Sequence, residues 1–363
     1  MVRVNKSFCR IQKFYGQERY QHRWGGRKSH LLFNNIISLE NLFSAWKEFK
    51  KGKTKRPDVH KFEFNLEDSL FELNQELKTK IYFHSDYNPF YIADPKLRHI
   101  HKAEVKDRIV HQAIFRVLYP VFDKNFIHDS YSCRVHKGTH RAVIRLNKFC
   151  NKLSKNNSIN IYVLKCDIKK FFDSVDQNIL SEVIKRKVCD ENTIWLIQKI
   201  IKSFEKEKGK GLPLGNVTSQ LFANIYLNEL DQFVKHKLKV KYYIRYCDDF
   251  VILGKDKNVL FLTAGKIDEF LNYNLSLSLH SDKIIIRKYR QGVDFLGYVV
   301  LPYHRVVRTR TKRRIFRKLM KIKKKLESSL ISKGSFNHSI QSYLGILKHC
   351  NGYKINQEIL NLG

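Results

Sequence analysis

The chain has 363 residues, of which 43% are hydrophobic, so it exceeds one average domain and can bury a sizeable core. Its 69 Lys and Arg residues outnumber 34 Asp and Glu residues, which gives a formal net charge of +35. A surplus of this size indicates a polyanionic partner, because solubility alone requires far less charge. The composition therefore favours a nucleic-acid partner, with a membrane surface as the main rival.

The membrane alternative lacks support in the sequence. No apolar run approaches the roughly 20 residues that span a bilayer. Residues 1–26 carry charges throughout and lack the apolar segment of a secretory signal. The seven cysteines are scattered and odd in number, which suits reduced thiols better than a disulfide framework. We therefore expect a cytoplasmic protein without a membrane partner.

The N-terminal part of the chain predicts two helices separated by a charged loop. Residues 1–30 are basic and aromatic without a clear period, and are either an extension that orders on RNA or a protein partner, or a flexible tail. Ser38 is a good N-cap for the first helix. Residues 51–59 predict a charged linker loop, and a second helix follows Asn65. The residues expected to face inward in that second helix are Leu66, Leu70, Phe71, Leu73 and Leu77.

The rest of the chain predicts strands mixed with helices. Hairpins are expected over 89–101 and 241–253, and strands over 159–168 and 292–300. Helices are expected over 106–119, over 218–238 with Thr218 or Ser219 as the cap, and from about residue 309 onward. The last helix is very basic and places Ile315, Leu319, Ile322 and Leu326 on one stripe. This order indicates an α+β fold with a central sheet.

Two adjacent acids, Asp248 and Asp249, interrupt the apolar and aromatic hairpin "KYYIRYCDDFVIL". Buried neighbouring carboxylates repel each other and lose hydration, so a fold keeps them only where something compensates. Asp167 ends the strand "INIYVLKCDI", and neighbouring strands could bring the three carboxylates together. Such a set suits a hard divalent cation, Mg²⁺ or alternatively Mn²⁺. Two ions about 4 Å apart would activate a 3′-hydroxyl and neutralise a departing pyrophosphate.

At these residues the sequence resembles the reverse transcriptases. "IRYCDDFVIL" is similar to their Tyr-x-Asp-Asp box, and "LKCDIKKFFDSVD" to their first aspartate motif. Further segments resemble the remaining family motifs in the family's order: "PKLRHIHKAEVKDRIVHQA", "HDSYSCRVHKGTHRAV", "LPLGNVTSQLFANIYLNELD", "LSLHSDK" and "FLGY". The resemblance extends from about residue 35 to residue 353. Joint occurrence in this order is far more specific than any single motif.

The resemblance implies a right-hand polymerase with fingers, a ferredoxin-like palm and a helical thumb. The expected boundaries are 31–158 for the fingers, 159–300 for the palm with a finger-side insertion at about 185–212, and 301–363 for the thumb. The thumb helix would follow the template–primer backbone through phosphate contacts. Residues 299–363 are expected to leave room for a thumb but not for an RNase H, endonuclease or DNA-binding domain.

A narrower resemblance rests on residues 214–220. Most reverse transcriptases have Gln-Gly in the loop and Ser-Pro at the helix start, whereas this chain has Leu214-Gly215 and Ser219-Gln220. These residues are most similar to the reverse transcriptases of diversity-generating retroelements. Such enzymes copy a template RNA into cDNA with errors opposite adenines, and work with an accessory protein that is a small basic helical bundle. Antiphage-defence reverse transcriptases, which act with a cognate non-coding RNA, share related motifs and stay as the alternative.

The resemblance also assigns roles to individual residues. Asp167 and Asp248 would ligate both metal ions, with Asp249 beside them and the Ile168 carbonyl completing one shell. Lys96 and Arg98 would bind the triphosphate of the dNTP. Phe172 would act as a steric gate against a 2′-hydroxyl, and Lys283 as a general acid toward pyrophosphate. Further contacts with the dNTP, the template RNA or the cDNA/RNA hybrid are expected from Leu214, Gly215 and Gln220. The alternative role for Phe172 is a core aromatic, which suits neighbouring Phe171 better.

Leu214 leads to a fidelity hypothesis. In common reverse transcriptases a glutamine at this position contacts the incoming nucleotide and supports the pairing check. An apolar side chain cannot make those hydrogen bonds, so we expect reduced fidelity. A different class of function, a catalytically silent RNA-binding scaffold on a polymerase fold, is disfavoured because such proteins tend to lose their acids and all three are present here.

Overall fold

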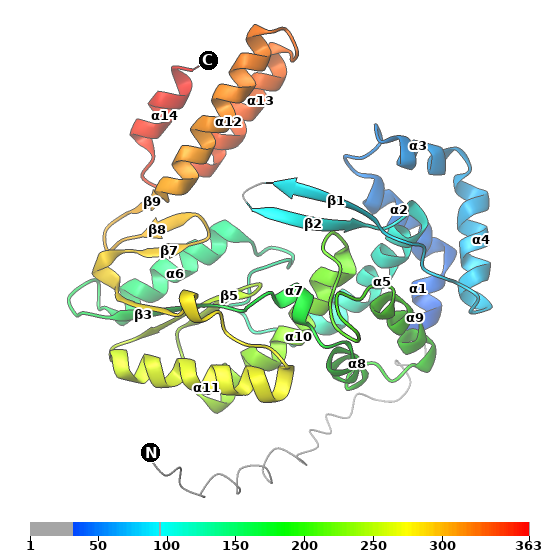
Figure 1. Cartoon of the computed structure of the whole chain (residues 1–363), viewed down its shortest axis with the longest axis horizontal. Helices are drawn as coiled ribbons and strands as arrows, with labels where there is room; N and C mark the ends of the chain where they lie inside the picture. Colours follow the sequence, from blue (N-terminus) through cyan, green and yellow to red (C-terminus); the bar gives the residue numbers. More distant parts are fainter. Residues whose placement is uncertain (1–31, 94–95, 363) are drawn as a thin grey trace, which may run out of the picture.

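The computed structural model describes residues 32–93 and 96–362, so the predicted N-terminal extension lies outside the described residues. An N-terminal group of helices packs around a buried core that includes Trp46 and Leu70. Its helices are α1 (Leu32–Ile37), α2 (Leu39–Lys50), α3 (Pro57–Phe64), α4 (Leu66–Lys78) and α5 (Val105–Asp123). The antiparallel hairpin of β1 (Asn88–Ala93) and β2 (Leu97–Lys102) extends from this group (Figure 1).

The predicted helices of this region are confirmed, with two corrections. Ser38 caps α2, because its hydroxyl accepts a hydrogen bond from the Asn41 amide at 3.2 Å. The segment 51–59 is not all loop, since Pro57 starts α3; proline suits the first helical position because no amide partner is needed there. Phe71 is 50% exposed instead of facing inward. Consecutive residues point to different sides of a helix, and its neighbour Leu70 is the one that is buried.

A four-stranded antiparallel sheet forms the centre, with strand order β4-β5-β3-β6. Its strands are β3 (Tyr162–Asp167), β4 (Tyr243–Tyr246), β5 (Asp249–Gly254) and β6 (Ile285–Lys288). Alternation sends Leu164 and Cys166 into the core shared with α10 (Val217–Gln232) and α11 (Lys257–Leu275), whereas Val163 packs into a second core with α6 (Thr139–Leu153). The predicted strand over 159–168 and the hairpin over 241–253 are confirmed.

The start of α10 differs from the prediction. The helix begins at Val217 with Asn216 as the N-cap, and neither Thr218 nor Ser219 caps it. The Thr218 hydroxyl is hydrogen-bonded to His111 at 2.6 Å, so it is committed to α5. The chain from β3 to η4 contains further short elements: α7 (Phe171–Ser174), α8 (Gln177–Lys185), α9 (Glu191–Lys202), the π-helical turn η3 (Phe233–Lys237) and the 3-10 turn η4 (Ser281–Lys283).

The C-terminal part consists of a small sheet and three helices that rise from it (Figure 1). Residues 292–300 form two strands instead of one, β7 (Val293–Phe295) and β8 (Tyr298–Val300), because Leu296 and Gly297 adopt positive φ and reverse the chain. The 3-10 turn η5 (Tyr289–Gln291) precedes β7, and β9 (Arg305–Val307) completes the sheet. The helices are α12 (Thr309–Glu327), α13 (Lys333–Leu347) and α14 (Tyr353–Leu360). The predicted stripe of α12 is confirmed, since Ile315 and Leu319 are buried and Ile322 and Leu326 pack beside them.

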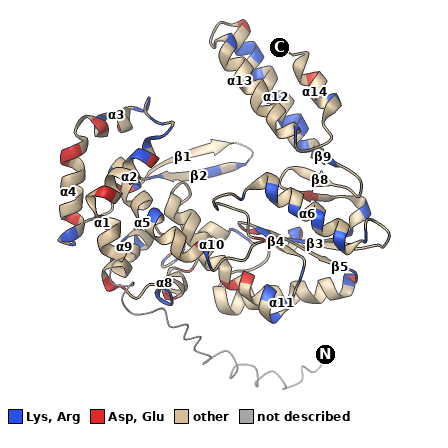
Figure 2. Cartoon of the chain, turned by 180° about the vertical axis from the view of Figure 1, so that it is seen from behind, with Lys and Arg blue, Asp and Glu red and all other residues tan. Residues whose placement is uncertain are grey.

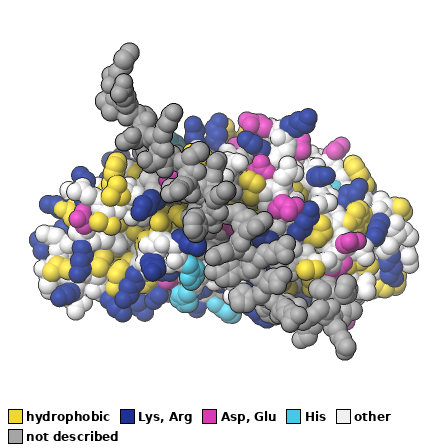
Figure 3. All heavy atoms as spheres, turned by 90° about the horizontal axis from the view of Figure 1, so that it is seen from below, with side chains coloured by type: hydrophobic (Ala, Val, Ile, Leu, Met, Phe, Trp, Pro, Cys, Tyr) yellow, Lys and Arg dark blue, Asp and Glu magenta, His cyan; other side chains and the backbone are white. Residues whose placement is uncertain are grey.

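Charge is distributed unevenly over the fold. Figure 2 shows Lys and Arg on α6, α12 and α13, whereas Asp and Glu are prominent on α3 and α4. On the face seen in Figure 3, Lys and Arg side chains lie toward both ends of the molecule, while Asp and Glu lie mostly in its right half. Among the described residues, none of the helices is both long and apolar enough to cross a membrane.

Candidate active site

The three predicted acids meet at one end of the central sheet. Asp167 is the last residue of β3 and Asp249 the first of β5, and the two are directly paired in the antiparallel register. The backbone amide of Ile168 donates a hydrogen bond to the Asp248 carbonyl at 3.2 Å. The sheet register therefore brings together side chains that are far apart in the sequence.

Burial and mutual repulsion change the acidity of this cluster. Burial, with added repulsion from the Asp167 and Asp248 carboxylates, raises the pKa of Asp249 to about 6, while Lys165 opposes the shift. Burial likewise raises the pKa of Asp248, with a further contribution from Asp167 and an opposing one from Lys283. Ionising these carboxylates together is costly, so a cation placed among them would be strongly attracted.

Two lysines already approach the acids. Lys283, on η4, forms an ion pair with Asp167. The Lys165 Nζ atom lies 3.9 Å from an Asp249 carboxylate oxygen. The same Nζ atom donates a hydrogen bond to the Asp294 main-chain carbonyl at 3.2 Å. Sequence reasoning did not single out Lys165. Strand alternation could have found it, because residues 165 and 167 lie on the same face of β3.

The donor set fits a divalent cation in chemistry but not yet in orientation. Carboxylate oxygens are the ligands that Mg²⁺ prefers, and three of them lie at this sheet end. As oriented here, no three His, Cys, Asp or Glu side chains in the described ranges converge where they could hold one ion. The Asp167 carboxylate instead contacts the Lys283 ammonium. The metal roles of Asp167, Ile168, Asp248 and Asp249 therefore stay predictions.

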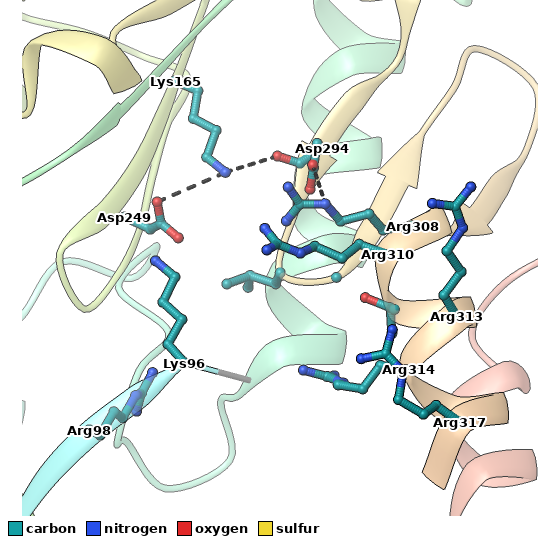
Figure 4. Close-up of a pocket in the computed structure, with 13 residues that line it drawn as sticks. Lys96, Arg98, Lys165, Asp249, Asp294, Arg308, Arg310, Arg313, Arg314 and Arg317 are labelled. Atoms are coloured by element: carbon teal, nitrogen blue, oxygen red, sulfur yellow. Dashed lines mark hydrogen bonds and ion pairs between the residues drawn. The ribbon is translucent and has the colours of Figure 1, made fainter. Parts of the chain in front are cut away.

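A basic cavity of about 680 Å³ opens beside Asp249. The β1–β2 hairpin, the central sheet, the β7–β8 turn and the first half of α12 surround it, as Figure 4 shows. The charged residues that line it are Lys96, Arg98, Lys165, Asp249, Asp294, Arg308, Arg310, Arg313, Arg314 and Arg317. Arg308 is held by an ion pair with Asp294 at 2.8 Å. Eight cations against two anions make the cavity suitable for phosphate groups.

The structure brings two predicted phosphate-binding residues, Lys96 and Arg98, into this cavity from the hairpin. The α12 arginines were predicted only as part of a basic helix that contacts the nucleic-acid backbone, because the sequence does not show which other elements lie beside α12. Phe171 is 2% exposed and belongs to the core, whereas its neighbour Phe172 is only partly buried. The steric-gate role of Phe172 stays a prediction that this burial difference favours.

The loop of residues 212–216 lies under the β1–β2 hairpin. The His101 amide donates to the Leu214 carbonyl at 2.9 Å, and the Leu212 amide donates to the Phe172 carbonyl at 2.7 Å. Gly215 has φ +123, and a Cβ atom there would lie 3.0 Å from Ile100 Cγ2. Glycine is therefore needed for the approach of loop to hairpin. Gln220 is exposed on α10, and the nucleotide contacts of Leu214, Gly215 and Gln220 stay predictions.

The sequence profile of the reverse transcriptase (RNA-dependent DNA polymerase) family matches residues 93–300. This segment contains all three acids and the basic hairpin residues, and it covers more than half of the chain. The chain therefore belongs to the reverse transcriptase family.

Several proteins are similar in sequence to part of this chain. Protein YkfC of Escherichia coli (strain K12) is 26% identical over 255 residues, which cover 60% of this chain and 65% of that protein. The group II intron-encoded protein LtrA of Lactococcus lactis subsp. cremoris is 24% identical over 303 residues, or 64% of this chain and 49% of that protein. The chain thus spans less than two thirds of the length of these relatives. A solved telomerase from Candida tropicalis matches 76% of this chain and 56% of its own at 16% identity, with a TM-score of 0.46.

Proposed function

We propose that the protein is an RNA-directed DNA polymerase that extends a primer by transferring nucleotides from dNTPs along an RNA template. The observation that carries this proposal is the pairing of Asp167 with Asp249 across β3 and β5, next to a basic cavity. The cavity gathers eight basic side chains beside the acids at this sheet end, which supports chemistry on a polyanion.

The residues around the cavity have complementary tasks in this proposal. Lys96 and Arg98 on the hairpin bind the triphosphate, since guanidinium and ammonium groups donate to its oxygens. The α12 arginines hold the phosphodiester backbone of the template–primer without choosing a sequence. The three acids would hold divalent ions, and bound ions would supply positive charge beside the 3′-hydroxyl and the departing pyrophosphate.

Fingers, palm and thumb are proposed with the boundaries expected from the sequence. The helices α1–α6 and the hairpin would be the fingers, the central sheet with α10 and α11 the palm, and α12–α14 the thumb. The cavity lies where all three meet (Figure 4). This arrangement would place the template–primer between the hairpin and α12.

We further propose the retroelement subtype, with an accessory helical-bundle protein and reduced fidelity at template adenines. Its support is Leu214-Gly215 and Ser219-Gln220 in the loop and helix start. Leu214 is half-buried, and its carbonyl is hydrogen-bonded to the hairpin that carries Lys96 and Arg98. An apolar side chain there offers no hydrogen bond to the incoming nucleotide.

Primer extension on an RNA template tests the proposal. Wild-type protein should incorporate dNTPs in the presence of Mg²⁺, and the Asp248→Ala Asp249→Ala variant should not. The silent-scaffold alternative predicts tight RNA binding in both proteins and incorporation in neither. Incorporation by the double variant at the wild-type rate would contradict the assignment of these acids.

A further inference from the structure

Arg245 is a fully buried arginine three positions before Asp248. It is 0% exposed, and it lies on β4 with its side chain directed toward α10. Strand alternation places Tyr243 on the same face, and both side chains reach Asp231 on α10. A charged group is rarely buried so completely unless it is paired and hydrogen-bonded.

The pair with Asp231 is bidentate. Arg245 donates from Nε to Asp231 Oδ1 at 2.8 Å and from Nη2 to Asp231 Oδ2 at 2.7 Å. The Tyr243 hydroxyl donates to the same Oδ1 atom at 2.8 Å. The planar guanidinium is therefore fixed in both position and plane.

The remaining hydrogen bonds of the Arg245 side chain reach a second residue of α10, the neighbouring segment at Ser130 and the turn that precedes Asp248. Nη1 donates to the Cys247 carbonyl at 3.2 Å and to Asn224 Oδ1 at 3.3 Å, and Nη2 donates to the Ser130 hydroxyl at 3.1 Å. The main chain of Arg245 adds two bonds to the same neighbouring segment, from its amide to the Asp129 carbonyl at 3.0 Å and from the Tyr131 amide to its carbonyl at 2.9 Å. Through its side chain and main chain together, Arg245 thus connects α10, residues 129–131 and the turn after β4.

The contact with Cys247 matters because of the backbone at that residue. Cys247 has φ +55, a conformation that side chains other than glycine seldom adopt, and it directly precedes Asp248. The Arg245 Nη1 atom holds the Cys247 carbonyl, and the Ile168 amide holds the Asp248 carbonyl at 3.2 Å. The two peptide groups that flank Asp248 are therefore each held by a hydrogen bond to a carbonyl.

General stability is a weak explanation for this arrangement. Replacing a buried ion pair by apolar side chains of similar volume is often neutral or stabilising, since desolvation offsets the attraction. An apolar pair would fill the space between β4 and α10, but it would leave the Cys247 carbonyl without its donor. The hydrogen bond from Arg245 to the Cys247 carbonyl is explained by the turn that it holds.

We propose that Arg245 is a positioning residue, which orients the Cys247–Asp248 turn through the Cys247 carbonyl and uses Asp231 as its fixed base. It touches no substrate itself and acts through Asp248. The inference rests on the proposed polymerase function and deepens it. A displacement of about 1 Å at a catalytic group costs about 100-fold in rate.

The test separates stability from positioning with a triple variant, Asp231→Leu Tyr243→Phe Arg245→Met. It removes the ion pair and the hydroxyl that would otherwise lose its partner. We expect its melting temperature to stay within about 3 °C of wild type, while kcat for dNTP incorporation falls about 100-fold and the KM for dNTP changes less than about threefold. The matched control is Lys50→Met Glu63→Leu, which removes a pair of 2.7 Å between α2 and α3 and should leave kcat unchanged.

A second readout does not depend on turnover. The rise in melting temperature that MgCl₂ gives wild-type protein should be lost or halved in the triple variant. A folded triple variant with wild-type kcat and a wild-type response to MgCl₂ would overturn the inference. If the triple variant does not fold, the Arg245→Lys variant provides the test, since a single ammonium cannot replace the several N–H donors of a guanidinium. We expect its kcat to fall about tenfold, and an unchanged kcat would overturn the inference. An inactive wild-type protein would instead refute the proposed function, and the MgCl₂ response would then test the positioning role alone.

Discussion

Asp167 and Asp249 face each other across two antiparallel strands, so two like charges are held together at the end of the central sheet. The Lys283 ammonium contacts the first carboxylate, and Lys165 lies 3.9 Å from the second. Ionising both carboxylates at this sheet end is therefore unfavourable, and the lysines offset this only in part. The pKa of Asp249 still rises to about 6, mainly through burial.

This cost predicts an unusual pH dependence of stability. Because the pKa of Asp249 is raised on folding, the native state holds the proton more tightly than the unfolded chain. The free energy of unfolding should therefore fall as the pH rises from about 4 to about 6, and stay reduced above that range. Asp249→Asn removes the ionisation, so in EDTA it should melt about 2 °C above wild type near neutral pH, with a smaller difference near pH 4.

Thermal melts across this pH range measure the effect. Asp68→Asn, at an exposed carboxylate on α4, is the matched control and should show no such pH-dependent difference. A melting temperature of Asp249→Asn below that of wild type near neutral pH would contradict the claim that the ionised Asp249 carboxylate destabilises the folded protein.

The central strands and the acids were predictable from sequence for a physical reason. Mostly apolar segments that contain isolated acids are easily recognised in a sequence, and residues 159–168 and 241–253 gave Asp167 and Asp249 in this way. Their pairing was not predictable, because register depends on which strands become neighbours. The Asp294–Lys165 hydrogen bond shows the same limit, since it joins residues of two different sheets.

The errors of prediction have local causes. Residues 51–59 are charged, and the charge concealed that Pro57 can begin a helix. Thr218 has the chemistry of a cap, but its hydroxyl is engaged by His111 on another helix. The inward side of α12 followed from its apolar stripe, whereas its arginines could be assigned to the cavity only once the sheet and hairpin were placed.

The burial of neighbouring phenylalanines predicts which one selects the sugar. Phe172→Val should relax the preference for dNTPs over NTPs by about tenfold or more, because it removes the ring that would clash with a 2′-hydroxyl. Phe171→Val, the matched control, should lower the melting temperature and leave the preference intact, since Phe171 is 2% exposed and packs in the core. Competition between dNTP and NTP in primer extension measures the preference, and equal selectivity in Phe172→Val and wild type would exclude the gate.

Lys283 is predicted to act on the departing pyrophosphate as well as on Asp167. Lys283→Met should lower kcat by about 100-fold, the scale of a lost general acid. Lys283→Arg keeps the charge beside Asp167 but donates its proton poorly at neutral pH, so its kcat should also fall. Single-turnover rates measured against pH provide the check. Full activity of Lys283→Arg would show that the lysine serves only as a counter-charge.

The arginines of α12 predict a salt-dependent affinity for the template–primer. The Arg314→Gln Arg317→Gln variant should bind an RNA–DNA hybrid more weakly, and the slope of log K against log salt should become shallower by about 1.5 to 2. Lys257→Gln Lys266→Gln on exposed positions of α11 removes the same charge away from the cavity and should leave the slope nearly unchanged. Titrations at several salt concentrations measure both, and equal slopes in the two variants would argue against α12 as the backbone contact.

Leu214 provides the prediction on fidelity. Its carbonyl is held by the His101 amide, so a change of side chain leaves the loop attached to the hairpin. Leu214→Gln supplies hydrogen-bonding groups toward the incoming nucleotide, and it should lower misincorporation opposite template adenine by about tenfold, which corresponds to about 1.4 kcal/mol. Leu214→Met, apolar and of similar volume, should keep the wild-type error rate. Sequencing of cDNA from a single-stranded RNA template measures the errors. An unchanged error rate in Leu214→Gln would show that Leu214 is not the cause of misincorporation.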